Sequence, residues 1–285
     1  NAFARTMNSP RTRHSQVGNA NVNYIEGSGV YMNGGLLDDV VIDHGGARGL
    51  YSYGSLYMTG GIATNCQISA NVGGWRGQYS RGHGAVVNGA GALLTHSVIR
   101  GNGTLDMTCQ AAGVFLNNGT LRNCLVADNL SKDYNAGVYL GDGSTAPRLE
   151  SCTIAGNRTV TDANGNAALH QASGKVLNSI IYGNGPEGAT GSGCYVASGV
   201  FATNCLAAPL DGYPLNLVEN PRFRKPAEGD YHVKQLSPVI DQGDNQPWMA
   251  GAGDLDGLPR LHLGGRVDLG CYESPRALGT KIIVR

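Results

Sequence analysis

One short motif recurs along this chain at a nearly constant spacing. The stretch Leu121–Asn129 reads LRNCLVADN, and four other segments repeat its order: a small anchor residue, an apolar residue two positions later and Asn five positions later. Equivalent anchors are 26 to 31 residues apart. They are Val40, Cys66, Ser97, Cys124, Cys152, Ser179 and Cys205. A unit of this length cannot bury its own apolar face, so the period predicts a solenoid of stacked coils.

Two apolar runs in each repeat predict the strands. An Ile or Val follows most anchors by two positions, and a second run begins about ten residues before most of them, as in GVYMNGG from Gly29 and GVFLNNG from Gly113. Neither the fixed Leu offsets nor the helical half of a leucine-rich repeat is present. Short runs punctuated by Gly and Asn predict an all-β fold, a parallel β-helix of about seven coils over residues 1–217.

The anchor column explains the cysteines. Equivalent residues of successive coils lie about 4.8 Å apart, so small inward side chains stack on their own kind. Val, Ser and Cys have a suitable volume, and an unpaired Cys behaves as a small hydrophobe. We therefore expect free, stacked thiols at Cys124 and Cys152, with a disulfide between them as the alternative. Cys109, Cys194 and Cys271 lie outside the column, and the sequence does not indicate their partners.

A column of asparagines follows the anchors. Its members are Asn71, Asn102, Asn129, Asn157 and Asn184. Asn tolerates the left-handed backbone of a sharp corner, and stacked carboxamides bond to one another along a ladder. Four asparagines also stand in Asn-x-Ser/Thr sequences, which makes glycan attachment the alternative interpretation. They are Asn102, Asn118, Asn129 and Asn157.

Charge and hydropathy exclude some classes of partner. The formal net charge is zero, and 15% of the residues are charged. This balance provides neither a basic surface for nucleic acid nor a polybasic run for anionic lipid. No run of 18 apolar residues occurs, so no membrane span is expected. The sequence also shows no secretory signal.

The repeat ends after Cys205, and from Val218 the chain becomes rich in proline and charge. Five motifs then follow in order: Asn220–Phe223 (NPRF), Asp230–Val233 (DYHV), Ser237–Gly243 (SPVIDQG), Asp254–Arg260 (DLDGLPR) and Val267–Glu273 (VDLGCYE). They resemble the C-terminal signature of bacterial secreted right-handed β-helix repeat proteins, the pectate-lyase-like or choice-of-anchor group. Only Val233 departs from it, where Leu is usual. With the coils, the resemblance covers nearly the whole chain.

This resemblance implies a right-handed helix and an extracellular or cell-surface location. We expect residues 218–285 to hold an irregular cap, folded across the last coil to cover its unpaired strand edges, and the start of a following linker or module. The polar residues expected to bond within the cap are Asp241, Asp254, Asp256, Arg260 and Asp268. No cofactor is expected. The alternative is a calcium ion at Asp254 and Asp256. The DLDG sequence, however, lacks the further acidic ligand of a calcium loop, which is why no cofactor is the preferred expectation.

Both ends of the chain resemble parts of the segment with which domains of this family begin. The family often opens on a strand, a turn and a segment ending in Asn-Ala-Phe, whereas this chain begins NAFARTM and ends GTKIIVR. We therefore expect a segment of a larger protein, with tandem modules or end-to-end assembly.

The loops after the Asn column are the expected functional surface, because loops on a rigid scaffold concentrate function. The longest, Val72–Gly84, carries aromatic and cationic residues that could stack on sugar rings and pair with carboxylates. The ligand-binding candidates are Trp75, Arg76, Tyr79, Lys132 and Asp133. The catalytic candidates are Arg81, His83, Asp106 and Tyr134. Asp106, Asp133 and Asp162 could form a file across three coils. The plainer interpretation is that Trp75 folds back onto the helix body and the charges are solvated.

Two functions remain open at this point. The first is a structural or adhesive module at the cell surface that contacts a glycan or another surface protein, because the coils hold few acidic residues and no paired carboxylates on one strand face. The second is a carbohydrate-active enzyme on an acidic polysaccharide, a glycoside hydrolase or, more plausibly, a lyase. The fold hosts both kinds of protein, so the site must decide.

Overall fold

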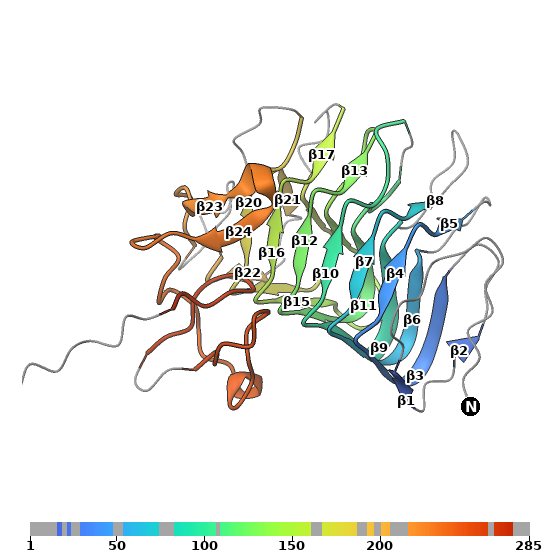
Figure 1. The fold of residues 1–285 in the computed structure, drawn as a ribbon, viewed down its shortest axis with the longest axis horizontal. Helices are drawn as coiled ribbons and strands as arrows, with labels where there is room; N and C mark the ends of the chain where they lie inside the picture. The colour runs from blue at the N-terminus through green and yellow to red at the C-terminus, as the bar shows by residue number, and fades with distance from the viewer. Residues whose placement is uncertain are drawn as a thin grey trace, which may run out of the picture.

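The fold is described from a computed structural model of the chain. The structure describes residues 16–18, 22–23, 29–47, 54–73, 83–106, 109–160, 167–186, 193–196, 201–205, 216–261 and 265–275. In this part the chain is almost entirely β, and its strands stack in parallel into a solenoid (Figure 1). The predicted parallel β-helix is therefore confirmed.

The first sheet is the widest side of the solenoid. Its early strands are long: β3 (Val30–Asp38), β6 (Leu56–Thr64), β9 (Ala85–Thr95) and β11 (Val114–Arg122). Later coils replace each long strand with two short ones: β14 (Val138–Leu140) with β15 (Arg148–Glu150), β18 (Leu169–Gln171) with β19 (Lys175–Leu177), and β21 (Cys194–Val196) with β22 (Phe201–Thr203). At the other end β1 (Gln16–Gly18) and β2 (Val22–Asn23) pair antiparallel with β3 and cover part of its edge.

The second sheet contains six short strands in parallel register. They are β4 (Val41–Asp43), β7 (Gln67–Ser69), β10 (Val98–Arg100), β12 (Leu125–Ala127), β16 (Thr153–Ala155) and β20 (Ile180–Tyr182). A third side carries the pairs β5 (Gly46–Ala47) with β8 (Val72–Gly73) and β13 (Leu130–Ser131) with β17 (Arg158–Thr159). The solenoid makes about five turns. Counting seven anchors gave a higher number, because the coil of Cys205 has no second-sheet strand among the described residues, and the six strands of this sheet are separated by five turns.

Like residues stack on like residues in the interior. The central residue of each second-sheet strand points inward, and these residues pair in register from Ile42 through Ile68, Ile99, Val126 and Ile154 to Ile181. All six are fully buried. Stacked coils therefore bury one continuous apolar column that no single coil could bury alone.

The anchor column lies in the interior as predicted. All seven anchors are buried, and every cysteine of the chain is free, so the stacked-thiol prediction is confirmed over the disulfide. Each Cys or Ser anchor also donates to the carbonyl two residues earlier: Cys124 Sγ lies 3.1 Å from Arg122 O, and Ser97 Oγ lies 2.6 Å from Thr95 O. Cys and Ser thus interchange here because both are small and both can donate this bond.

Two columns of left-handed residues turn the chain at its corners. The residue before each anchor has a φ between 44° and 54°; these residues are Asp39, Asn65, His96, Asn123, Ser151, Asn178 and Asn204. A second column stands one residue before each Asn position: His44, Ala70, Gly101, Asp128, Gly156 and Gly183. Asn, Asp and Gly adopt this backbone at low cost, which accounts for much of the composition at the corners.

The Asn column forms a continuous buried ladder. Asn129 Nδ2 donates to Asn157 Oδ1 at 2.9 Å and to Ile99 O at 3.1 Å, while its Oδ1 accepts the backbone N–H and the Nδ2 of Asn102. The same pattern links Asn71 to Asn102 and Asn157 to Asn184. The glycan alternative is wrong for Asn102, Asn129 and Asn157, because their amides are buried and bonded. Asn118 lies outside the ladder, and its side chain bonds Asn88 and Thr145.

The C-terminal segment lies along the solenoid. It contains β23 (Phe223–Lys225), the short 3-10 helix η2 (Pro226–Glu228), β24 (Asp230–Val233) and η3 (Pro247–Met249). Its apolar residues pack on outward-facing side chains of the second sheet; the cluster comprises Phe223, Tyr231, Val239, Leu269 and Cys271 with Leu125, Ala127, Ala155 and Ile180. In Figure 1 the orange hairpin of β23 and β24 overlies this side near β20.

This placement corrects the expected cap across the last coil. Asn216 does close the anchor column, since its Oδ1 accepts the backbone N–H of Cys205 at 2.8 Å. Farther on, however, the segment bonds successive corners along the side of the solenoid: Gly253 O lies 3.0 Å from His96 Nε2, and Gln242 O lies 3.0 Å from Asn204 Nδ2. The physical reason is the apolar outer face of the later coils, which has to be covered.

Asn129→Ala tests the ladder. The substitution removes the partners of the buried Asn102 N–H and Ile99 carbonyl, and it removes one bond from the side chain of each neighbouring Asn, so we expect the free energy of unfolding to fall by about 3–5 kcal/mol. Asn33→Ala is the control, because Asn33 is exposed and accepts a bond from Thr59; its loss should stay below about 1 kcal/mol. Urea unfolding measures both. Equal losses would show that the ladder has no special share in stability.

Candidate functional site

Part of the predicted loop surface lies outside the described residues. Trp75, Arg76, Tyr79, Arg81 and Asp162 belong to that part of the chain. Their roles therefore stay predictions.

His83 lies in the interior, directly before β9. Its side chain is 1% exposed, its backbone N–H donates to Ala111 O at 3.2 Å, and its carbonyl accepts the N–H of Ser55 at 3.1 Å. Burial lowers the pKa of the imidazole from 6.5 to about 4. A neutral, enclosed ring differs from the solvent-facing acid or base that the loop position suggests.

The other candidates stand on neighbouring coils. Gly103 pairs with Leu130, so Asp106 and Asp133, each three residues farther on, occupy equivalent positions. Asp106 and Lys132 are exposed, and Asp133 and Tyr134 are half-buried. This register supports the first two members of the predicted carboxylate file. Their chemical role stays a prediction.

The carboxylate of Asp254, one of the two alternative calcium ligands, bonds the backbone of its own segment. Asp254 is buried, and its oxygens accept the backbone N–H groups of Asp256 (2.9 Å), Leu258 (2.7 Å) and Glu273 (2.7 Å). Asp256 Oδ2 lies 2.7 Å from His232 Nε2. Within the described ranges, no group of three or more His, Cys, Asp or Glu residues is placed to hold a metal ion. The Asp254 carboxylate thus stabilises a turn, and the Asp256 carboxylate contacts His232 of β24.

A buried ion pair holds the end of the C-terminal segment. Arg260 Nη1 lies 3.0 Å from Glu273 Oε1, and Arg260 Nη2 donates to Gly270 O at 2.9 Å. Burial raises the pKa of Glu273 to about 8, although the Arg260 charge opposes the shift. Asp268 Oδ1 accepts the N–H of Asp241 at 2.8 Å. The expected local bonding within the segment is confirmed for Asp254, Arg260 and Asp268.

Two carboxylates on the coils are held in structural ion pairs that the sequence did not indicate. Glu150 is almost fully buried on the first sheet and pairs with both Arg122, at 2.9 Å, and Arg148. Asp128 stands at a corner, where Arg100 Nη2 lies 2.8 Å from its Oδ2 and the hydroxyl of Tyr231 donates to its Oδ1 at 2.6 Å. Burial, followed by the Asp128 carboxylate, raises the pKa of Tyr231, so this hydroxyl remains a donor.

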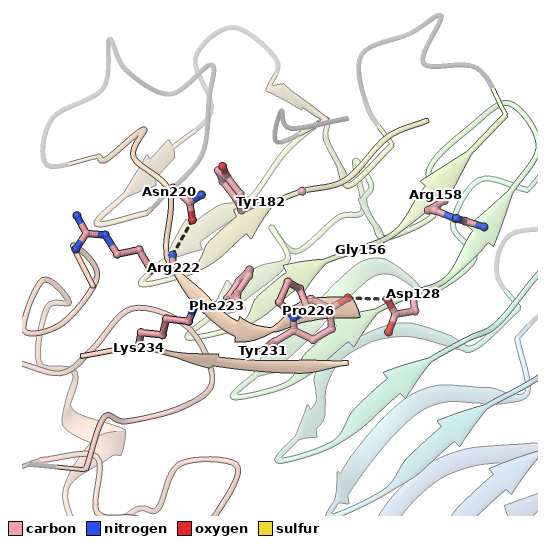
Figure 2. A pocket seen from close by; sticks show the side chains of 11 residues that line it. Asp128, Gly156, Arg158, Tyr182, Asn220, Arg222, Phe223, Pro226, Tyr231 and Lys234 are labelled. Carbon is pink, nitrogen blue, oxygen red and sulfur yellow. Dashed lines mark hydrogen bonds between the residues drawn. The ribbon is translucent and has the colours of Figure 1, made fainter. Parts of the chain in front are cut away.

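A pocket of about 610 Å³ opens where the β23–β24 hairpin meets the solenoid, and we call it the hairpin pocket. Figure 2 shows it between the hairpin and the corner that follows β16 and β20. Its lining divides into an aromatic and apolar part (Tyr182, Phe223, Pro226, Tyr231), a polar and cationic part (Arg158, Asn220, Arg222, Lys234), two glycines (Gly156, Gly183) and Asp128.

The sequence contains a partial signal for this site. The first position of each second-sheet strand changes from the exposed Gln67 to the buried Leu125 and Ile180. An apolar outward position predicts that something covers the strand. The aromatic residues of NPRF and DYHV, Phe223 and Tyr231, supply that cover.

Gly156 and Gly183 provide a matched test of hairpin docking. Both are left-handed, with φ of 65° and 66°, so an Ala at either strains the backbone equally, by about 1–2 kcal/mol. A Cβ on Gly156 would lie 2.1 Å from Tyr231 Oη and 2.5 Å from Asp128 Oδ1, whereas one on Gly183 meets nothing within 4 Å. We expect Gly156→Ala to cost about 1–3 kcal/mol more than Gly183→Ala in urea unfolding, because it breaks the Tyr231 bond. Equal costs would contradict the docking geometry.

The burial of His83 predicts a pH dependence of stability. Its folded pKa lies below the unfolded value, so its contribution is complete above about pH 6.5 and is lost as the pH falls toward 4, by roughly 3 kcal/mol. His83→Gln should remove this loss in urea unfolding, and His44→Gln should not, because the His44 side chain is 72% exposed. An NMR titration of the His83 ring checks the pKa directly. A midpoint near 6.5 would contradict the burial argument.

No family model matches the chain, and neither a curated protein nor a solved structure is significantly similar to it. In the described residues, no helix is long and apolar enough to cross a membrane. The function must therefore be argued from the chain's own residues.

Proposed function

We propose that the chain is a rigid β-helical module of an extracellular or cell-surface protein, with a structural or adhesive role. The observation that supports this proposal best is the use of the coil carboxylates. Glu150 is buried between two arginines, and Asp128 is shared by Arg100 and Tyr231. Glycoside hydrolysis needs two convergent carboxyl groups with opposite protonation roles. Carboxylates held in structural ion pairs suit a scaffold better than such a reaction.

The stacking outside the core also supports a stiff element. Outward-facing rings of the first sheet stack in two groups, on either side of Val86: Tyr31 lies 5.5 Å from Tyr57, Phe115 lies 5.1 Å from Tyr139, and Tyr139 lies 4.6 Å from His170. Within each group the rings are roughly parallel and stack on one another. These stacks add contacts between coils on the outer surface to those of the Asn ladder inside. Nearest-neighbour contacts of this kind determine the stability of a solenoid.

The extracellular assignment draws on the C-terminal motifs. Their resemblance to bacterial secreted β-helix proteins favours a location outside the cell, where a glycan or another surface protein is the natural partner. Free cysteines are more typical of reducing compartments, but all of these are buried, and burial raises the pKa of the thiols, for example that of Cys66 to about 11, so they are compatible with an oxidising setting. Buried thiols of this kind are inert structural residues.

The rival function is a carbohydrate-active enzyme, and the hairpin pocket is the observation in its favour. Tyr182 and Tyr231 stand there with arginine and lysine residues, which are the groups that a lyase uses as a base and to neutralise a substrate carboxylate. The Tyr231 hydroxyl, however, donates to Asp128 and has a raised pKa, so it is poorly suited to accept a proton. This bond favours a structural role for Tyr231.

Incubation with a panel of acidic polysaccharides tests the proposal. We expect the full chain to form neither unsaturated products, followed by ultraviolet absorbance, nor new reducing ends. A known polysaccharide lyase serves as the positive control. Product formation would overturn the structural proposal in favour of the enzyme. If Asp106→Asn or Tyr134→Phe then abolished it, the reaction would belong to the surface predicted from the loops.

A further inference from the structure

We infer that the hairpin pocket binds an anionic saccharide chain whose sugar residues carry carboxylates. The inference deepens the proposed adhesive role and rests on it, by assigning the glycan contact to a defined place and a chemical class. The place differs from the surface predicted from the loops after the Asn column. It is created where the C-terminal hairpin docks on the side of the solenoid.

The floor of the pocket is a rigid aromatic cluster. Phe223 meets Tyr231 edge to face, with ring centroids 5.3 Å apart and planes at 86°, and meets Tyr182 at 6.5 Å and 72°. Phe223 and Tyr231 are mostly buried, and Tyr182 is half-buried beside the opening. Tyr182 is therefore the ring with exposed apolar area, fixed by its packing on Phe223 at a low entropic cost, and the C–H face of a pyranose ring is a suitable partner for it.

The rim carries an excess of positive charge. Arg158, Arg222 and Lys234 line the pocket, and all three are exposed. Asp128 is the one acidic residue among the described lining residues, and Arg100 already neutralises it at 2.8 Å. The remaining charge suits an anionic ligand, for which arginine provides paired N–H donors.

The position of the cations distinguishes a saccharide from a small anion. Figure 2 shows Arg158 at one end of the pocket and Lys234 at the other, with the aromatic rings between them, whereas the Arg222 side chain extends away from the rings. A phosphate or sulfate ion would need donors that converge on one point. Charges at both ends of an apolar floor instead match an extended ligand with separated carboxylates and apolar ring faces between them.

Two features prepare the pocket for a ligand. The backbone at Arg222 is fixed, since its N–H donates to Asn220 Oδ1 at 2.7 Å and its Nη1 holds the side chain on Leu236 O at 3.0 Å, outside the space between the rings. Gly183 leaves open space where any side chain would project, because nothing lies within 4 Å of the position of its Cβ. A volume of about 610 Å³ is also within the usual range for ligand pockets.

Titration calorimetry with tetragalacturonic acid tests the inference on the full chain. We expect binding that weakens at least about tenfold in the Arg158→Gln/Lys234→Gln double variant, which removes a charge from each end of the pocket. The fully methyl-esterified tetramer should bind at least about tenfold more weakly than the acid, because its carboxylates are neutralised. Lys175→Gln is the control, because it removes one exposed charge on β19 of the first sheet, away from the pocket, and it should leave the affinity unchanged. The substituted residues are exposed, so equal thermal unfolding midpoints should confirm intact folds.

Several results would overturn the inference: no binding of the acid tetramer, unchanged binding in the double variant, equal affinity for the methyl ester, or full competition by millimolar inorganic phosphate. A loss in Lys132→Gln together with unchanged binding in the double variant would move the contact to the predicted loop surface. Measuring both binding and product formation in the same samples distinguishes failure of the pocket inference from failure of the proposed structural function. Binding without product supports both; binding with product retains the pocket and rejects the structural module; neither binding nor product rejects the pocket alone.

Discussion

The buried amide ladder is the contact on which the rest of the structure depends. At each corner after the second sheet the backbone turns, and its peptide groups would be left unpaired inside the protein. The carboxamide of Asn102 meets this need by donating to Ile68 O at 2.9 Å and by accepting the N–H of Asn71 at 3.1 Å. Unpaired buried groups are costly, so the ladder holds neighbouring coils in register. That register aligns the apolar columns and the outward-facing rings.

Regular coils present different outer faces along their length. Near the start, Gln67 is exposed on the second sheet, whereas Leu125 and Ile180 lie under the C-terminal segment. The segment therefore acts as a lateral cover, anchored by Tyr231 on Asp128 and by Gly253 on His96. Because the cover is a hairpin on a ridged surface, it leaves a hollow at its edge. The hairpin pocket is thus a consequence of how the outer face is buried.

Charge is used in two ways in this molecule. The buried acids Glu150 and Glu273 are matched by arginines and hold the architecture together. Among the described residues, the cations around the hairpin pocket have no such matched acids at the rim, where Arg158 and Lys234 face solvent. A chain of zero net charge can therefore present a local positive site, because charge balance over the whole chain does not require balance at each surface.

The sequence by itself determined the features that repeat. The anchor column, the free thiols, the Asn ladder and the parallel β-helix all follow from residues about 27 positions apart, since each coil meets a near-copy of itself and the same side chain recurs at the same height. The tertiary structure decided what does not repeat. Tyr231 reaches Asp128 across 103 positions, and Gly253 reaches His96 across 157, and no period constrains either contact. The lateral docking of the C-terminal segment and the pocket beside it depend on such single pairings, which only the folded chain brings together.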